Sequence, residues 1–90
     1  MNLEYWRSEI DEIDAEILRL LQSRALVVEK IVRIKAGAGL PLIDERRERA
    51  ILRSVLSRRK EPLSIEAVEC VFGCIIRESR RIQIEATGAE

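Results

Sequence analysis

Apolar positions in the first third of the chain follow one continuous helical pattern. They recur at alternating steps of three and four residues, with one polar exception: Leu3, Trp6, Ile10, Ile13, Ile17, Leu20, Arg24, Val27, Ile31 and Ile34. This heptad spacing is typical of a helix that packs lengthwise against a partner helix. Because no Pro or Gly comes before Gly37, the pattern predicts a single helix over about residues 3–36.

The length of this helix implies more than one copy of the chain. At 1.5 Å per residue it would be roughly 50 Å long, whereas a compact chain of this size is only about 30 Å across. One chain cannot cover such a seam of apolar residues. We therefore expect an oligomer, most simply a two-fold homodimer, in which a second copy buries part of the seam.

A second, shorter helix follows a break at residues 36–41, which combine two glycines with a proline. We expect this helix to begin at Leu42 or Asp44 and to end at Ser57 or Arg59. Acidic residues at its start and basic residues at its end suit the helix dipole. The basic end is interpreted as a solvated helix terminus rather than a binding patch.

A third helix is predicted after a second break at residues 60–63. Ser64 is the expected N-cap, since its hydroxyl can accept a hydrogen bond from the first turn. The apolar stripe of this helix ends in two polar positions, Ser79 and Gln83. Residues 87–90 are expected to fray. The prediction is thus an all-α fold with one long and two shorter helices in a single domain over residues 1–90.

Each predicted helix interrupts its own apolar stripe with polar side chains. They are Arg24 and Lys35 on the first helix, Asp44, Arg47 and Glu48 on the second, and Ser79 and Gln83 on the third. A single interruption is usually an internal ion pair or a residue that sets helix register, because unpaired buried charge costs several kcal/mol. Three interruptions on helices that must pack together predict a polar pocket inside a helical bundle.

The charges of this pocket predict a small anionic ligand. Arg24 and Lys35 lie about three turns apart and so face the same way. Arg7 is about 25 Å from Arg24 along the helix, which is too far for both to contact one small molecule. A second copy of the chain could instead supply its Arg7. With that residue counted, cations outnumber carboxylates in the pocket.

Overall composition excludes several classes of partner. Lys plus Arg equals Asp plus Glu, at 16 each, which argues against a nucleic acid or a membrane surface as partner. No apolar run approaches the length of a membrane span, and the N-terminus lacks a signal-peptide pattern, so a cytoplasmic protein is expected.

Cysteine and histidine usage limits the possible chemistry. The chain has two cysteines and no histidine, so a zinc site is unsupported. Cys70 and Cys74 lie four residues apart in a helical pattern, and we expect buried or half-buried reduced thiols. The absence of histidine also removes Ser-His and Cys-His nucleophile arrangements.

The polar residues together resemble the all-α chorismate mutase family over essentially the whole chain. The three matching segments are Arg7-x-x-Ile10-Asp11-x-Ile13-Asp14 followed by Arg24, then Lys35 with Pro41-x-x-Asp44-x-x-Arg47-Glu48, and finally Ser79-x-x-x-Gln83. Each segment alone is a weak signal, but the three in order are specific. The resemblance implies an intertwined homodimer that rearranges chorismate to prephenate, on the route to Phe and Tyr.

The resemblance also implies roles at the carboxylate end of the substrate. Arg24 and the partner's Arg7 would hold the two carboxylates of chorismate. Arg47 would support this electrostatic cage, and Ser79 would line the same end of the pocket.

At the other end, the resemblance implies a set of hydrogen-bonding groups. Lys35 and Gln83 would donate to the ether oxygen, where charge grows as the C–O bond breaks. Glu48 would bind the ring hydroxyl, and Asp44 would lie nearby and orient Lys35. The rearrangement occurs within one molecule and needs no nucleophile, metal or cofactor. Conformer selection and preorganised donors would supply the catalysis.

Two alternative functions remain open from the sequence. Isochorismate-pyruvate lyase shares this fold and much of the pocket, although the set Asp44, Arg47 and Glu48 resembles the mutase more closely. A non-catalytic helical dimerisation module is the other alternative. Setting the register of paired helices needs only one buried polar residue. Here three apolar stripes are interrupted, which argues against a module that only dimerises.

Overall fold

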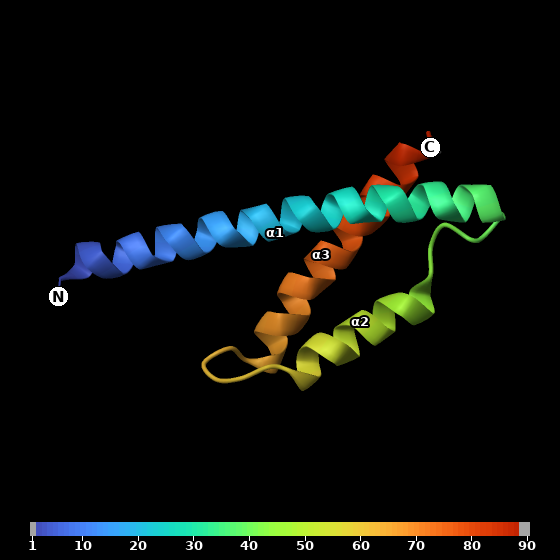
Figure 1. Cartoon of the computed structure of the whole chain (residues 1–90). Coiled ribbons are helices and arrows are strands. Elements are labelled where there is room, and N and C mark those ends of the chain that lie inside the picture. The colour runs from blue at the N-terminus through green and yellow to red at the C-terminus, as the bar shows by residue number, and fades with distance from the viewer. Residues whose placement is uncertain (1, 89–90) are drawn as a thin grey trace.

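Three α-helices make up the computed structural model, which describes residues 2–88 (Figure 1). They are α1 (Leu3–Ala38), α2 (Glu45–Ser57) and α3 (Ile65–Ala86). The predicted all-α fold with one long and two shorter helices is therefore confirmed. Of the expected frayed tail, residues 89 and 90 lie outside the described part of the chain.

Local signals account for both ends of α1. The Asn2 side chain accepts a hydrogen bond from the Tyr5 backbone N–H at 3.0 Å, which caps the first turn. The helix ends at Gly39, which adopts a left-handed conformation with φ 67° that favours glycine. The prediction stopped the helix two residues early, because Gly37 is accommodated in the last turn and Gly39 makes the cap.

The two shorter helices begin at capping side chains. Asp44 Oδ1 accepts a hydrogen bond from the Arg47 backbone N–H at 2.9 Å at the start of α2. Ser64 Oγ accepts one from the Ala67 N–H at 3.0 Å at the start of α3. The prediction of Ser64 as N-cap is confirmed, and Asp44 has the same role for α2.

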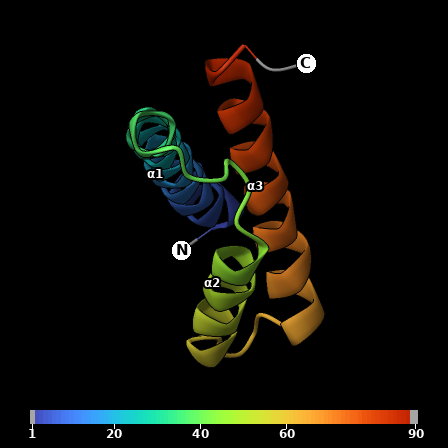
Figure 2. The same cartoon turned by 90° about the vertical axis from the view of Figure 1, so that its right-hand side faces the viewer.

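The helix α3 packs against both other helices, whereas α1 and α2 do not approach each other closely along their backbones. Figures 1 and 2 show α3 crossing the C-terminal half of α1, while the N-terminal half of α1 projects past the other two helices. The molecule is accordingly elongated, with extents of 56 × 23 × 19 Å. Its radius of gyration is 16.3 Å, against about 12 Å for a compact domain of this length.

The contact of α1 with α3 uses a different apolar stripe from the predicted seam. Val28 and Val32 of α1 are only 8% and 3% exposed. The two valines lie one position along the helix from seam residues Val27 and Ile31, which are 51% and 41% exposed. α1 therefore has a broad apolar face, of which its own chain covers one edge.

Most of the predicted seam is uncovered in the single chain. Its first six positions are each 50% to 61% exposed: Leu3, Trp6, Ile10, Ile13, Ile17 and Leu20. Despite this apolar stripe, none of the helices within residues 2–88 is long and apolar enough to cross a membrane. The intertwined homodimer stays a prediction.

The two cysteines differ from expectation in one respect. Cys70 and Cys74 are free thiols, but both are exposed rather than buried or half-buried. The apolar residues around them predicted burial. α3 has only two neighbouring helices, however, which leave part of its circumference uncovered, and Val71 is also 56% exposed there.

Candidate active site

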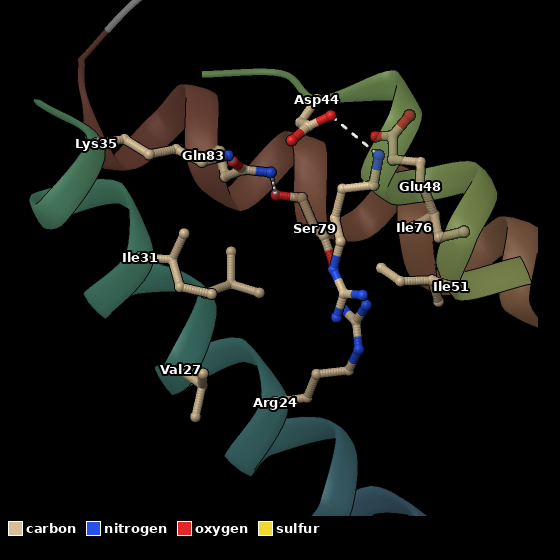
Figure 3. Close-up of a pocket in the computed structure, with 12 residues that line it drawn as sticks. Arg24, Val27, Ile31, Lys35, Asp44, Glu48, Ile51, Ile76, Ser79 and Gln83 are labelled. Carbon is tan, nitrogen blue, oxygen red and sulfur yellow. Dashed lines mark hydrogen bonds between the residues drawn. The ribbon is translucent and has the colours of Figure 1, made fainter. Parts of the chain in front are cut away.

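A cavity of about 370 Å³ lies where the three helices meet (Figure 3). All seven polar residues that interrupt the apolar stripes line it: Arg24, Lys35, Asp44, Arg47, Glu48, Ser79 and Gln83. The apolar part of its wall is formed by Val27, Val28, Ile31, Ile51 and Ile76. A cavity of this size, mostly apolar with convergent polar groups, suits a small organic ligand.

Arg24 is held in the cavity by the third helix. Its Nη1 donates a hydrogen bond to Ser79 Oγ, and Ser79 Oγ donates in turn to the Ile75 carbonyl at 3.1 Å. Ser79 is 8% exposed, so the hydroxyl lies in the packed part of the bundle. This chain of hydrogen bonds directs a long, flexible side chain into the cavity.

A second guanidinium lies close to that of Arg24. Burial of Arg24 and repulsion from the positive charge of Arg47 both lower the pKa of Arg24 from its ordinary value, although an arginine so placed stays protonated. Within residues 2–88, neither guanidinium forms an ion pair with a carboxylate. Two neighbouring cations without an ion-paired carboxylate favour binding of an anion at this end of the cavity.

Lys35 and Gln83 are joined by a hydrogen bond at the opposite end of the cavity. Lys35 Nζ donates hydrogen bonds to the Leu42 carbonyl at 2.8 Å and to Gln83 Oε1 at 3.2 Å. The Gln83 Nε2 group donates to the Ser79 carbonyl at 3.3 Å. Since an amide NH₂ carries two donors, one N–H of Gln83 and one of Lys35 are available to a ligand in the cavity.

Asp44 has a structural role as well as a place in the cavity wall. Its carboxylate caps α2 and so fixes the turn that presents Arg47 and Glu48. The resemblance implied that Asp44 orients Lys35. In this structure the acceptors that hold the Lys35 ammonium are instead the Leu42 carbonyl and Gln83 Oε1.

Glu48 is paired with a residue that sequence reasoning missed. Arg80 donates from Nε to Glu48 Oε2 at 2.7 Å and from Nη2 to Oε1 at 2.6 Å. Hydrogen bonds from Arg80 are the largest influence on the Glu48 carboxyl and lower its pKa. Nothing in the sequence distinguished Arg80 from Arg77 or Arg81 on the same helix, because the pairing depends on how α2 packs against α3.

Arg7 lies outside the cavity formed by its own chain. Its side chain is 63% exposed and pairs with Glu4 at 2.9 Å in the first turns of α1. The remaining predicted site residues are brought together by one chain. Arg7 is at the opposite end of α1 from Lys35, as the sequence predicted.

Comparison with known proteins gives the family of this chain. The profile of the family described as chorismate mutase type II matches residues 6–84. The chain belongs to the type II chorismate mutase family. The chorismate mutase of Thermus thermophilus (form II) has a similar structure, with a TM-score of 0.87 and 31% identity over 90% of this chain and 92% of that one.

Two further relatives of the family are informative. Chorismate mutase from Helicobacter pylori, solved in complex with prephenate, has a TM-score of 0.86 and 31% identity over 96% of this chain and 93% of that one. A bifunctional chorismate mutase/prephenate dehydratase from Aquifex aeolicus is 48% identical over 59 residues, or 66% of this chain. This chain spans only 16% of the length of that protein. The resemblance predicted from the sequence is confirmed at the level of family and fold.

Proposed function

We propose that this chain catalyses the intramolecular rearrangement of chorismate to prephenate. The observation that carries the proposal is the pair Arg24 and Arg47, two cations in one cavity with no carboxylate partner within residues 2–88. A ligand with two carboxylates matches this excess of positive charge. Membership of the chorismate mutase family supports the choice of chorismate among such ligands.

The cavity has suitable groups for each part of this substrate. Arg24 would bind one carboxylate, and Arg47 would strengthen the positive potential around it. Lys35 and Gln83 would donate hydrogen bonds to the ether oxygen, where negative charge develops as the C–O bond breaks. Because these donors are already held in place, they would stabilise the transition state with little reorganisation.

The rest of the wall would select the reactive shape of the molecule. Glu48 would accept a hydrogen bond from the ring hydroxyl. The apolar side chains Val27, Ile31 and Ile51 would enclose the carbon skeleton and exclude water. Holding the two carbon atoms that must bond close together converts a rare conformer into the bound one, which is a large part of the catalysis in such reactions. No proton transfer or covalent intermediate is required.

We further propose that the active form is a homodimer. The exposed seam of α1 supports this, since six consecutive apolar positions each at least half exposed would be costly to leave in water. A second copy carries the same stripe and is the simplest occupant. In an antiparallel pair, the partner's Arg7 would reach the anion-binding end of the cavity and complete it.

The test is a spectroscopic assay on purified protein. Loss of chorismate absorbance with prephenate as the product is the expected result, and Arg24→Leu is a matched control with the pocket cation removed. Pyruvate from isochorismate with no turnover of chorismate would instead favour the lyase. If the protein binds neither chorismate nor isochorismate, the non-catalytic dimerisation module would be the better explanation.

A further inference from the structure

We propose that Arg80 is a positioning residue of the site. It holds the carboxylate of Glu48 in one orientation and in its ionised form, so that Glu48 acts only as a hydrogen-bond acceptor toward the ligand. The inference rests on the proposed function, because it assigns a purpose to Glu48 in that reaction.

Arg80 contacts Glu48 side-on through two nitrogen atoms. The distances are 2.7 Å from Nε to Oε2 and 2.6 Å from Nη2 to Oε1. Two parallel hydrogen bonds fix the plane of a carboxylate as well as its position. Each carboxylate oxygen has two lone pairs, so this contact still leaves one lone pair on each oxygen of Glu48 for a ligand hydroxyl.

The position of Arg80 on α3 explains why it acts through Glu48. Ser79 and Gln83 are four residues apart and face the cavity together, whereas Arg80 is turned by about 100° around the helix from Ser79. Arg80 is not part of the cavity wall, but Glu48 is. The guanidinium therefore contacts the Glu48 carboxylate from outside the cavity wall.

The charges around Glu48 give this arrangement an electrostatic consequence. Arg80 from α3 and Lys35 from α1 lower the pKa of Glu48, with Arg80 the larger influence, while burial and Asp44 raise it. Without Arg80, only Lys35 would oppose burial and Asp44. The pKa would then rise, and a protonated Glu48 would offer a donor where the substrate also presents a donor.

Arg80 also compensates the charge of Glu48 for a dianionic ligand. An isolated carboxylate in the cavity wall would repel the substrate, whereas a carboxylate paired from behind is largely neutralised. Arg80 would therefore let the site keep an acceptor for the hydroxyl without weakening its attraction for carboxylates. The simpler alternative is that the ion pair only ties α2 to α3.

The dependence of kcat/KM on pH separates these two roles. We would compare the wild type with Arg80→Ala, Arg80→Lys and Arg81→Ala from pH 9 down to the lowest pH at which each variant stays folded, so that the acidic limb of the wild type is included. Arg81 is the matched control, since it is the adjacent arginine and, within residues 2–88, pairs only with Glu78 and Glu85 of its own helix. We expect the acidic limb of the Arg80→Ala profile to move to higher pH, with the loss of activity concentrated at the acidic end of the range.

The two control variants have distinct expected profiles. Arg81→Ala should overlay the wild type. Arg80→Lys should return the acidic limb most of the way to its wild-type position, because it restores the positive charge. Its kcat should still be reduced, because a single ammonium cannot fix the carboxylate plane. A folded Arg80→Ala with the acidic limb of the wild type would overturn the proposal, as would an equal shift in Arg81→Ala. Should Arg80→Ala fail to fold, Arg80→Lys decides: an unchanged kcat would contradict the fixing of the carboxylate plane.

A second measurement does not depend on activity. Carbon NMR of the Glu48 carboxyl, in ligand-free protein, reports its titration directly. The midpoint should be higher in Arg80→Ala than in the wild type. If the wild type fails to convert chorismate, the proposed function fails, yet this titration still tests the action of Arg80 on Glu48. An unchanged midpoint would refute that action even in an active enzyme.

Discussion

The two halves of α1 have the same apolar pattern but different surroundings. In the C-terminal half, α3 covers Val28 and Val32, which are 8% and 3% exposed. In the N-terminal half, Ile13 and Ile17 are 53% and 50% exposed although they occupy equivalent heptad positions to cavity residues Val27 and Ile31. A heptad pattern specifies that a face is to be buried, but it does not specify which chain buries it.

The same contrast applies to the arginines of the two halves. Arg24, in the covered half, is held by Ser79 of its own chain and points into the cavity. Arg7, in the uncovered half, pairs with Glu4 on the surface. If the proposed dimer forms, each site combines one arginine from each half. Mutations in the two halves should then act differently. Those in the covered half should impair the reaction itself, and those in the uncovered half should impair formation of the dimer.

Arg24→Ala tests the covered half and should have the largest effect. We expect kcat/KM to fall by about a hundredfold or more, as when one preorganised charged donor is removed. The dimer should remain folded, because no apolar packing is lost. Arg24→Leu should be equally inactive yet at least as thermally stable, since apolar replacement of a buried charge often stabilises. Arg24→Leu with near-normal turnover would exclude Arg24 from the site.

Ile17→Asp tests the uncovered half. A carboxylate in the middle of the seam should dissociate the dimer, because burying an unpaired charge costs several kcal/mol. Activity should fall with it, although every cavity residue of the chain is intact. Sedimentation and turnover would be measured at the same protein concentrations. Ala15→Asp, an exposed position off the seam, is the control, and an active monomer of Ile17→Asp would contradict the shared site.

Mixed dimers of Arg7→Ala and Arg24→Ala test whether the two halves of α1 contribute to the same site. Each variant alone should be nearly inactive. After joint unfolding and refolding, half of the dimers should be mixed, and each mixed dimer has one site with both arginines. About a quarter of all sites should therefore contain both arginines and regain activity. Mass spectrometry would establish that mixed dimers are present, and no recovery in their presence would mean that Arg7 does not serve the partner's site.

Gln83→Glu should change the pH dependence while leaving the seam unaffected. The amide of Gln83 cannot titrate, so the wild type should keep its rate between about pH 6 and pH 9. The carboxylate variant has a proton to donate to the ether oxygen only in acid, and we expect its activity at pH 5 to exceed that at pH 8 by about tenfold or more. Equal rates at the two pH values would exclude Gln83 as the donor.

The smallest expected effect concerns stability in acid. Because Arg80 lowers the pKa of Glu48 below its ordinary value of 4.5, the folded state binds fewer protons there than the unfolded chain. The pair therefore stabilises the protein above pH 4.5, and this contribution is lost as pH falls through the lowered pKa. Arg80→Ala should lower the Tm at pH 7 by a few degrees and by less at pH 3. A difference in Tm that stays constant with pH would contradict this coupling.

Much of the architecture could be predicted because it depends on short-range interactions. The spacing of apolar residues specified the single long helix, and Ser64 as N-cap required only its own turn. The end of α1 was two residues off, since a glycine can either continue or end a helix and only the backbone conformation of Gly39 decides between them. The exposure of Cys70 and Cys74 was wrongly predicted, since exposure depends on how many helices surround α3.

The sequence by itself determined which residues would be polar on otherwise apolar faces, and the structure brings seven of them to one cavity. This was possible because helical periodicity places residues on a face without reference to other helices. Only the tertiary structure decided the pairing of Glu48 with Arg80, the support of Lys35 by Leu42 and Gln83, and the contact of Arg24 with Ser79. Apart from Leu42, which lies in the connection between α1 and α2, these partners lie on different helices and are set by the angles and offsets at which the helices pack.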